Sequence, residues 1–159
     1  IRHRQRDDET KSMLIARNEH RGRLKVDYSP GSWHLRTQAD FTYAMQQTRS
    51  FGYMLAQSIQ RDYKRIIISG TLGYFHTQDY NSRVFTYERG MLYDFSFPNF
   101  FGHGIRYSFM ARTMFNSHLI LLIKAATTDY FNRNTIGSGW QMIAHSAQTD
   151  IQLQAIVKL

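Results

Sequence analysis

The sequence predicts an all-β chain that forms the C-terminal portion of an antiparallel, up-and-down transmembrane β-barrel. From Leu35 to Gln46, apolar and polar side chains alternate almost without error, which is the period of a strand with two different surroundings. This segment exceeds the ~5–6 residues of an ordinary strand and reaches the ~9–11 that a tilted membrane strand requires. The aromatic share of 14% suits the aromatic girdles of such barrels.

The same alternation recurs along the chain and predicts about eight or nine strands. We expect them at residues 1–6, 12–28, 35–47, 51–59, 66–74, 105–115, 119–128 and 151–159. Turns and loops are expected at residues 7–10, 29–32, 48–50, 61–64, 77–82, 94–104, 116–117 and 130–148, and residues 83–93 are less regular. Sequential strands joined by tight turns run antiparallel.

Composition limits the class of protein. The longest wholly apolar run is Leu119–Ile123, far short of the ~20 residues of a membrane-spanning helix. The absence of cysteine excludes disulfides and cysteine-based metal or redox sites. The chain opens on Ile1–Arg6 without an apolar signal region. Because outer-membrane proteins need a signal, we expect residues 1–159 to be one domain, the C-terminal fragment of a larger barrel.

The two faces of the strands are assigned by their chemistry. A soluble sandwich or lipocalin-like barrel would turn the apolar face inward, but strand length, a chain that ends on a strand and aromatics near strand ends favour a membrane barrel. We assign these polar residues to the lumen: Lys25, Asp27, Arg36, Gln38, Asp40, Arg106, Arg112, Lys124, Gln152, Gln154 and Lys158. We assign these apolar residues to the lipid: Leu35, Phe41, Tyr43, Ile66, Ile68, Leu72, Ile105, Tyr107, Phe109, Leu119, Leu121, Ile123, Ile151, Leu153 and Val157.

The basic residues of the polar face have two interpretations. With Asp27 and Asp40 among them, they form a network of ion pairs that fills and stiffens the interior. Alternatively, they form a pore or docking surface that attracts anions. We favour the network because acidic partners are present. The formal charge of +8 suits nucleic acid, anionic lipid or an acidic ligand without choosing among them.

The sequence offers weak signals for chemistry. Its seven histidines are scattered: His3, His20, His34, His76, His103, His118 and His145. None has ligand spacing beside a carboxylate, so we predict no metal and no cofactor. The pairs His145–Ser146 and Ser117–His118 are sequence neighbours, which point to opposite faces in a strand. We therefore predict no catalytic residue and no enzyme. Gly102–Gly104 and Gly137–Gly139 lack a following helix and are typical of turns.

Three stretches and a last amphipathic strand carry a family resemblance. The stretches are Asp79–Arg83, Tyr87–Tyr107 and Asn134–Gly139. Together they resemble the C-terminal half of a Bacteroidetes family of outer-membrane β-barrel proteins, which is identified by an N-terminal helix-hairpin-helix domain. The resemblance implies a Gram-negative outer membrane. This chain departs from the family by lacking the helix-hairpin-helix segment and by carrying Trp140–Ile143 where members have acidic residues.

The predicted function is that of a structural or conduit subunit in an outer-membrane complex. We expect its partners to be outer-membrane lipid and further outer-membrane or periplasmic protein subunits. The alternative is a channel that handles DNA or another anion, with nucleic acid as the partner, since the family is linked to DNA uptake through the domain that is missing here. A barrel hydrolase is the third alternative, and it requires a histidine within hydrogen-bond reach of a serine.

Overall fold

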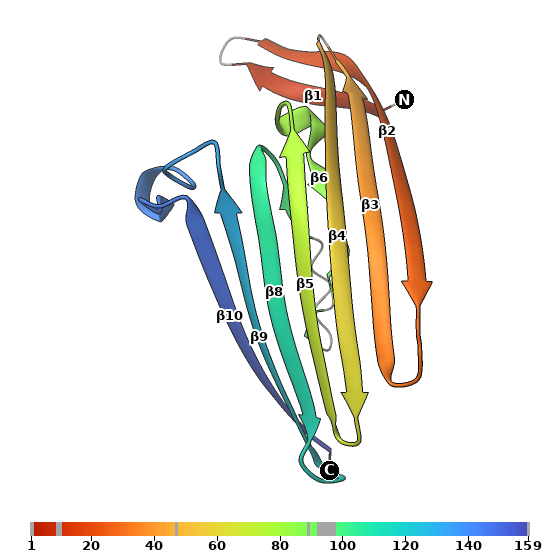
Figure 1. The fold of residues 1–159 in the computed structure, drawn as a ribbon. Coiled ribbons are helices and arrows are strands. Elements are labelled where there is room, and N and C mark those ends of the chain that lie inside the picture. Colours follow the sequence, from red (N-terminus) through yellow and green to blue (C-terminus); the bar gives the residue numbers. More distant parts are fainter. Residues whose placement is uncertain (1, 9–10, 47, 89, 92–97, 159) are drawn as a thin grey trace.

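The structure is a computed structural model in which the backbone is described for residues 2–8, 11–46, 48–88, 90–91 and 98–158, and the side chains from Asn18 onward. Eight strands form one sheet in the order β1-β2-β3-β4-β5-β8-β9-β10 (Figure 1). Their bounds are β1 Arg2–Asp8, β2 Lys11–Tyr28, β3 Trp33–Met45, β4 Arg49–Tyr63, β5 Ile66–Thr77, β8 His103–Met114, β9 Leu119–Tyr130 and β10 Ala147–Val157. The protein is therefore all-β.

Every pair of neighbouring strands runs antiparallel. The strand order follows the chain order except between β5 and β8, where the chain forms one short 3-10 helix and two short strands before it returns to the sheet. The sheet is curved but not closed, because no pairing joins β10 to β1 or β2 among the described residues. The prediction of an antiparallel, up-and-down sheet is thus confirmed, and the strands within the described residues form an open sheet.

The predicted strands differ from the observed ones mainly at their ends. The turn predicted at residues 61–64 is wrong in its extent, since β4 continues to Tyr63 and pairs there with Ile66. A two-residue turn remains, in which Lys64 has a φ of 49°. Such a tight hairpin needs a left-handed residue at its apex. The predicted turn at residues 7–10 falls partly on β1, and residues 9–10 lie outside the described part of the chain. Residues 94–97 of the aromatic loop predicted at residues 94–104 also lie outside it, and the remainder of that prediction is wrong in part, because β7 (Asn99–Phe100) and the start of β8 fall within it.

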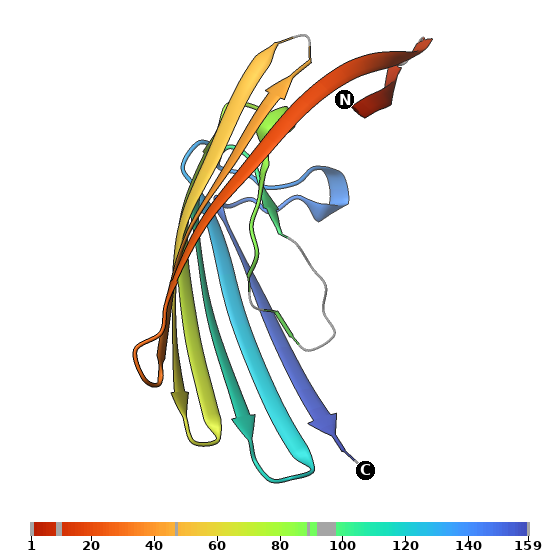
Figure 2. The ribbon, with the colours of Figure 1, turned by 90° about the vertical axis from the view of Figure 1, so that its right-hand side faces the viewer.

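A strap, defined here as residues 79–88, folds from the end of β5 onto the concave side of the sheet (Figure 2). It contains the 3-10 helix η1 (Tyr80–Ser82) and β6 (Val84–Phe85), and β6 pairs with the two-residue strand β7 (Asn99–Phe100). The carboxylate of Asp79 caps η1 by accepting the backbone N–H groups of Asn81 and Ser82. The strap thus begins at a defined point rather than as a free loop.

The buried apolar cluster lies where the strap meets the sheet. Met54 and Phe75 from the sheet pack with Val84 and Phe100 from β6 and β7, and all four are almost fully buried. The rings of Phe75 and Phe100 stack with centroids 5.2 Å apart. This cluster fastens the strap near one end of the sheet, so the polar residues that follow Phe85 are carried over the concave face.

Candidate functional site

The concave face of the sheet collects every residue that the sequence assigned to the lumen. The strand register places one residue of each strand from β2 to β10 in a single row across this face: Lys25, Gln38, Ala56, Gly73, Arg106, Thr128 and Gln148. Burial on this face falls from the strap outward. Gln38, Asp40 and Arg106 are buried, Arg36, Arg112, Lys124 and Gln154 are half-buried, and Lys25, Asp27, Gln152 and Lys158 are exposed.

Glu88 of the strap contacts two basic side chains at the centre of this polar face. Its two carboxylate oxygens accept hydrogen bonds from Arg106, Nε to Oε1 at 2.9 Å and Nη2 to Oε2 at 3.1 Å. Lys124 Nζ lies 3.4 Å from Oε2. The exposed fractions of these side chains are 3% for Glu88, 9% for Arg106 and 11% for Lys124. One buried carboxylate therefore balances two cations of β8 and β9.

A second polar cluster ties the strap to β2 and β3. Asp40 accepts hydrogen bonds from Arg23 Nε at 2.5 Å and from Gln38 Nε2 at 2.5 Å. Gln38 also donates to the hydroxyl of Thr86 at 3.0 Å, and Arg23 Nη2 donates to the carbonyl of Phe85 at 2.9 Å. The same side chains therefore cross-link two strands and hold the strap down.

The charge pattern is closer to an ion-pair network than to a bare cationic surface. Asp27 bonds Arg36 Nε at 2.6 Å and Lys25 Nζ at 2.9 Å, in addition to the pairs of Asp40 and Glu88. The DNA-channel hypothesis required unpaired arginines at positions 106 and 112, and Arg106 is paired. Arg112 differs, because its buried Nε has no hydrogen-bond partner among the described residues.

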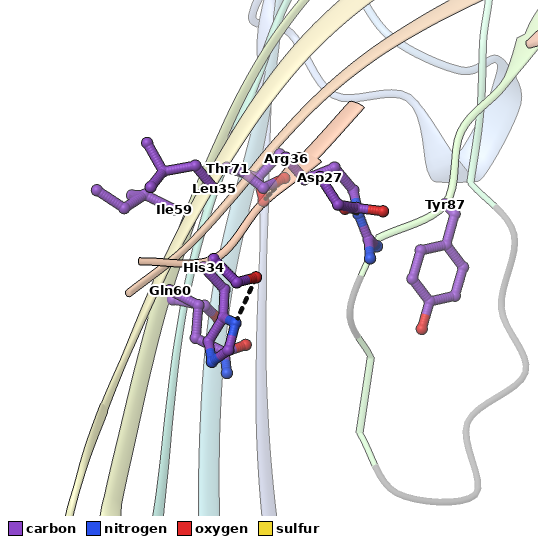
Figure 3. Close-up of a pocket in the computed structure, with 11 residues that line it drawn as sticks. Asp27, His34, Leu35, Arg36, Ile59, Gln60, Thr71 and Tyr87 are labelled. Carbon is purple, nitrogen blue, oxygen red and sulfur yellow. Dashed lines mark hydrogen bonds and ion pairs between the residues drawn. The ribbon is translucent and has the colours of Figure 1, made fainter. Parts of the chain in front are cut away.

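A polar pocket of about 360 Å³ lies on the concave face near the turn between β2 and β3 (Figure 3). Its wall carries the hydroxyls of Ser58, Ser69 and Thr71, the amide of Gln60 and the Asp27–Arg36 pair, and Tyr87 of the strap closes the opposite side. His34 points into it, and its Nδ1 lies 3.0 Å from the hydroxyl of Ser29. This is the serine–histidine contact that the hydrolase alternative required.

The two serine–histidine pairs that are neighbours in sequence, Ser117–His118 and His145–Ser146, make other contacts. Ser146 donates its hydroxyl to Asp129, and His118 uses its backbone N–H to bond Asn116. Neither contact joins a serine hydroxyl to an imidazole. Ser29 and His34 were missed because a turn folds them together, and such contacts are invisible to strand periodicity. Glu88 was missed because it lies in the irregular segment, where its partners on β8 and β9 are not apparent.

The convex face carries the apolar residues that the sequence assigned to lipid. Phe41, Ile66, Ile68, Leu72, Tyr107, Phe109, Leu121, Ile123, Ile151, Leu153 and Val157 are exposed there, and Leu35, Tyr43, Ile105 and Leu119 are half-buried. Exposure reaches 50% at Phe109 and 76% at Leu153. These side chains meet no other part of the described chain that could cover them. Most of this sheet face is therefore apolar and either exposed or half-buried, and Thr37, Gln57 and Arg61 are polar exceptions on β3 and β4.

Aromatic side chains form two rows on this convex face. One row, at the end of the sheet where the strap begins, has neighbouring ring centroids 5.1–6.5 Å apart and runs through Phe41, Phe51, Tyr53, Tyr74, His76, His103 and Phe131. At the opposite end, Tyr28, Trp33, Tyr63 and Phe115 lie beside the short turns and are exposed. Between the rows, the polar outward pair Thr37 and Gln57 bond each other at 2.6 Å.

Other site classes and known relatives add nothing to this picture. The described residues contain no group of three or more His, Cys, Asp or Glu side chains placed to hold a metal ion. Within the same residues, no helix has the length and apolar character to cross a membrane. Comparison with known proteins found no matching family model, no matching curated protein and no matching solved structure. The Bacteroidetes resemblance therefore stays a prediction.

Proposed function

We propose that the chain is part of an outer-membrane β-barrel in a Gram-negative bacterium, where it acts as a structural or conduit subunit of an outer-membrane complex. In this proposal the convex face contacts lipid and the concave face lines a lumen that the strap partly fills. The observation that carries the proposal is the exposed apolar band between two aromatic rows. A soluble protein rarely exposes a continuous apolar patch larger than a few hundred Å².

The height of the apolar band supports a location in a lipid bilayer. Tyr53 and Tyr63 mark the two aromatic rows on β4 and are ten residues apart, which is ~33 Å along a strand at ~3.3 Å per residue. A strand tilt of ~40° reduces this to ~25 Å along the membrane normal, the height of the apolar band in outer-membrane barrels. The hydrogen bond that the Thr37 hydroxyl donates to the side-chain oxygen of Gln57 is consistent with a lipid-facing position, because polar groups that face lipid must find partners within the protein.

The open edges of the sheet indicate what the complex must add. The eight strands of the sheet alternate in direction, so its edge strands β1 and β10 run in opposite directions. An all-antiparallel closure between them requires an even number of further strands. Unpaired backbone groups of β10 would be costly in lipid, and strands of the same or another polypeptide are the partners that we propose for it.

The proposal also gives an orientation. The connections after β2, β4 and β8 are short turns, whereas those after β5 and β9 are long. Outer-membrane barrels have short periplasmic turns and longer extracellular loops. We therefore place the strap and the segment between β9 and β10 at the extracellular end, and the turn at residues 29–32 at the periplasmic end.

Site-directed spin labelling tests the proposal directly, since the chain has no native cysteine to give background. Single cysteines replace Phe109 or its neighbour Ser108, which lie next to each other on β8 but face opposite sides. With the protein in its membrane, the label at position 109 is expected to collide with oxygen and to be shielded from a nickel chelate. The label at position 108 serves as the control and should be poorly accessible to oxygen. If the label at position 109 is as accessible to the chelate as a label in water, the convex face does not meet lipid.

An anion conduit is the second candidate, and it is favoured by the buried Nε of Arg112, which has no hydrogen-bond partner within the part of the chain that the structure describes. Nucleic acid is the less favoured anion, because Arg106 and Lys124 are already balanced by Glu88. Measuring the binding of double-stranded DNA over a range of salt concentrations distinguishes a DNA channel from a structural subunit. A DNA channel requires an affinity that falls steeply with salt, and a flat response would leave the structural role.

A further inference from the structure

We infer that Ser29 is an activated nucleophile and that the pocket beside it hydrolyses small, polar carboxylic esters. The inference is independent of the proposed membrane role, since it rests on three side chains and one pocket at the turn end of the concave face. Ser29, His34 and Asp62 make a continuous chain of polar contacts. A nucleophile, a base within hydrogen-bond reach and a group that orients the base are the elements of covalent acyl transfer.

The turn between β2 and β3 creates the first contact. Gly31 has a φ of 61°, a left-handed conformation that suits glycine, and Trp33 N–H bonds the carbonyl of Pro30 at 3.1 Å. The chain reverses direction within these residues and brings Ser29 beside the first residues of β3. The Ser29 hydroxyl then lies 3.0 Å from His34 Nδ1. A lone pair on Nδ1 can accept the hydroxyl proton at this distance.

The next strand supplies the second contact. Asp62 of β4 has Oδ2 3.3 Å from His34 Nε2, and its Oδ1 accepts a hydrogen bond from Gln60 at 2.5 Å. Its backbone N–H also bonds the carbonyl of Ser32 at 2.9 Å, which ties this part of β4 to the turn. A carboxylate on Nε2 favours the tautomer that keeps a proton there and leaves Nδ1 free as the base. Asp62 is therefore a positioning residue, and Ser29 and His34 are the catalytic pair.

The proposed reaction has two balanced steps. Ser29 Oγ attacks the carbonyl carbon of the ester while His34 takes its proton, and the alcohol leaves with that proton when the carbon–oxygen bond breaks. Water then attacks the acylated Ser29 with His34 as the base, which releases the carboxylic acid and restores the serine. Arg36 also lines the pocket; its Nε bonds Asp27 at 2.6 Å, and the other N–H groups of its guanidinium can donate to the oxyanion formed in each step.

The pocket limits the substrate. Its volume of about 360 Å³ is near the lower end of the range for ligand pockets, ~300–1,000 Å³. Serine and threonine hydroxyls and the Gln60 amide dominate its sheet-facing wall, and Tyr87 faces them from the strap. Leu35 and Ile59 also line the pocket, but two aliphatic side chains in a pocket of this size suit a short acyl group on a hydroxyl-rich alcohol better than a long alkyl chain.

Labelling of the whole protein with a fluorophosphonate, followed by mass spectrometry, tests Ser29 as a nucleophile. The label is expected on Ser29, and both Ser29→Ala and His34→Gln should abolish it. Ser117→Ala is the matched control, because this serine lies at the same end of the sheet beside a histidine in sequence without bonding it, and labelling should persist. Absence of label on Ser29, or equal labelling of the His34→Gln protein, overturns the inference.

Hydrolysis of p-nitrophenyl acetate and p-nitrophenyl octanoate tests the chemistry and the substrate size. We expect turnover of the acetate to exceed that of the octanoate, and His34→Gln to lower kcat/KM by at least about 100-fold, as expected for loss of a general base. Asp62→Asn should lower kcat with little change in KM, and Asp62→Glu should restore part of it. Equal rates in wild type and Ser29→Ala would refute hydrolysis at this site, while spin-label accessibility of the convex face would be unaffected.

Discussion

Replacement of Glu88 by glutamine is expected to release the strap and to remove a large part of the stability of the fold. The carboxylate is 3% exposed and contacts Arg106 at 2.9 and 3.1 Å and Lys124 at 3.4 Å. The variant leaves these two cations with the exposed carboxylate of Asp150, 4.0 Å from Arg106, as their remaining counter-charge. Breaking a buried pair in this way costs about 3–5 kcal/mol. That is a substantial share of the ~5–15 kcal/mol that keeps a typical domain folded.

The control uses the other carboxylate near Arg106. Asp150 lies 4.0 Å from the guanidinium, but its side chain is 54% exposed. Asp150→Asn should therefore change the free energy of unfolding by less than about 1 kcal/mol, as is usual for an exposed ion pair. A double variant, Glu88→Gln with Lys124→Met, removes one of the stranded cations and should recover part of the loss.

Two measurements check this prediction. Urea unfolding in detergent micelles, followed by the fluorescence of Trp33 and Trp140, gives the free energies of unfolding. Amide hydrogen exchange reports the strap, because Thr86 N–H bonds the carbonyl of Pro98 at 3.2 Å and should lose protection in Glu88→Gln. The reasoning is refuted if Glu88→Gln and Asp150→Asn have the same free energy of unfolding and Thr86 keeps its protection.

Two further predictions concern the start of the strap. Burial raises the pKa of Asp79, but the hydrogen bonds from the N–H groups of Ser82 and Asn81 outweigh it and hold the pKa below its ordinary value. The stabilisation that the Asp79 carboxylate provides is therefore complete above about pH 4 and is lost as pH falls through the folded pKa. Asp79→Ala should lower the free energy of unfolding by about 1 kcal/mol at pH 7. If urea unfolding shows an equal loss at pH 2, the reasoning is contradicted. Gly52→Ala would place a methyl group 2.1 Å from the carbonyl oxygen of Ser82. We therefore expect the free energy of unfolding to fall by about 1–3 kcal/mol and amide hydrogen exchange around η1 to become faster. A variant as stable as wild type would show that η1 does not pack against β4.

Alternation was enough to predict most of the sheet. The pattern from Leu35 to Gln46 corresponds to β3, Trp33–Met45, and it correctly separates Gln38 and Asp40 from Phe41 and Tyr43 on opposite faces. The reason is that period two is a local property, fixed by the backbone of each strand whatever its neighbours are. Boundaries were less accurate at β4, where polar residues near Tyr63 resemble a turn but continue the strand.

The strap and the pocket could not be predicted in the same way. Thr86 and Glu88 have no periodic neighbours, and their positions depend on partners at Gln38 and Arg106 that lie far away in sequence. The contact of Ser29 with His34 depends on the shape of one turn, and its link to Asp62 depends on the register between β3 and β4. Closure of the sheet is likewise not encoded by alternation, since a curved open sheet and a barrel have the same strand pattern.

The strap also affects the order in which the chain folds. Its hydrogen bonds join residues 62 positions apart at Arg23 and Phe85, and 48 positions apart at Gln38 and Thr86. The hairpins of the sheet close much shorter loops, which cost less chain entropy and form sooner. We therefore expect the sheet to assemble with its concave side still hydrated. Docking of Glu88 would then be the late step that expels water from between Arg106 and Lys124.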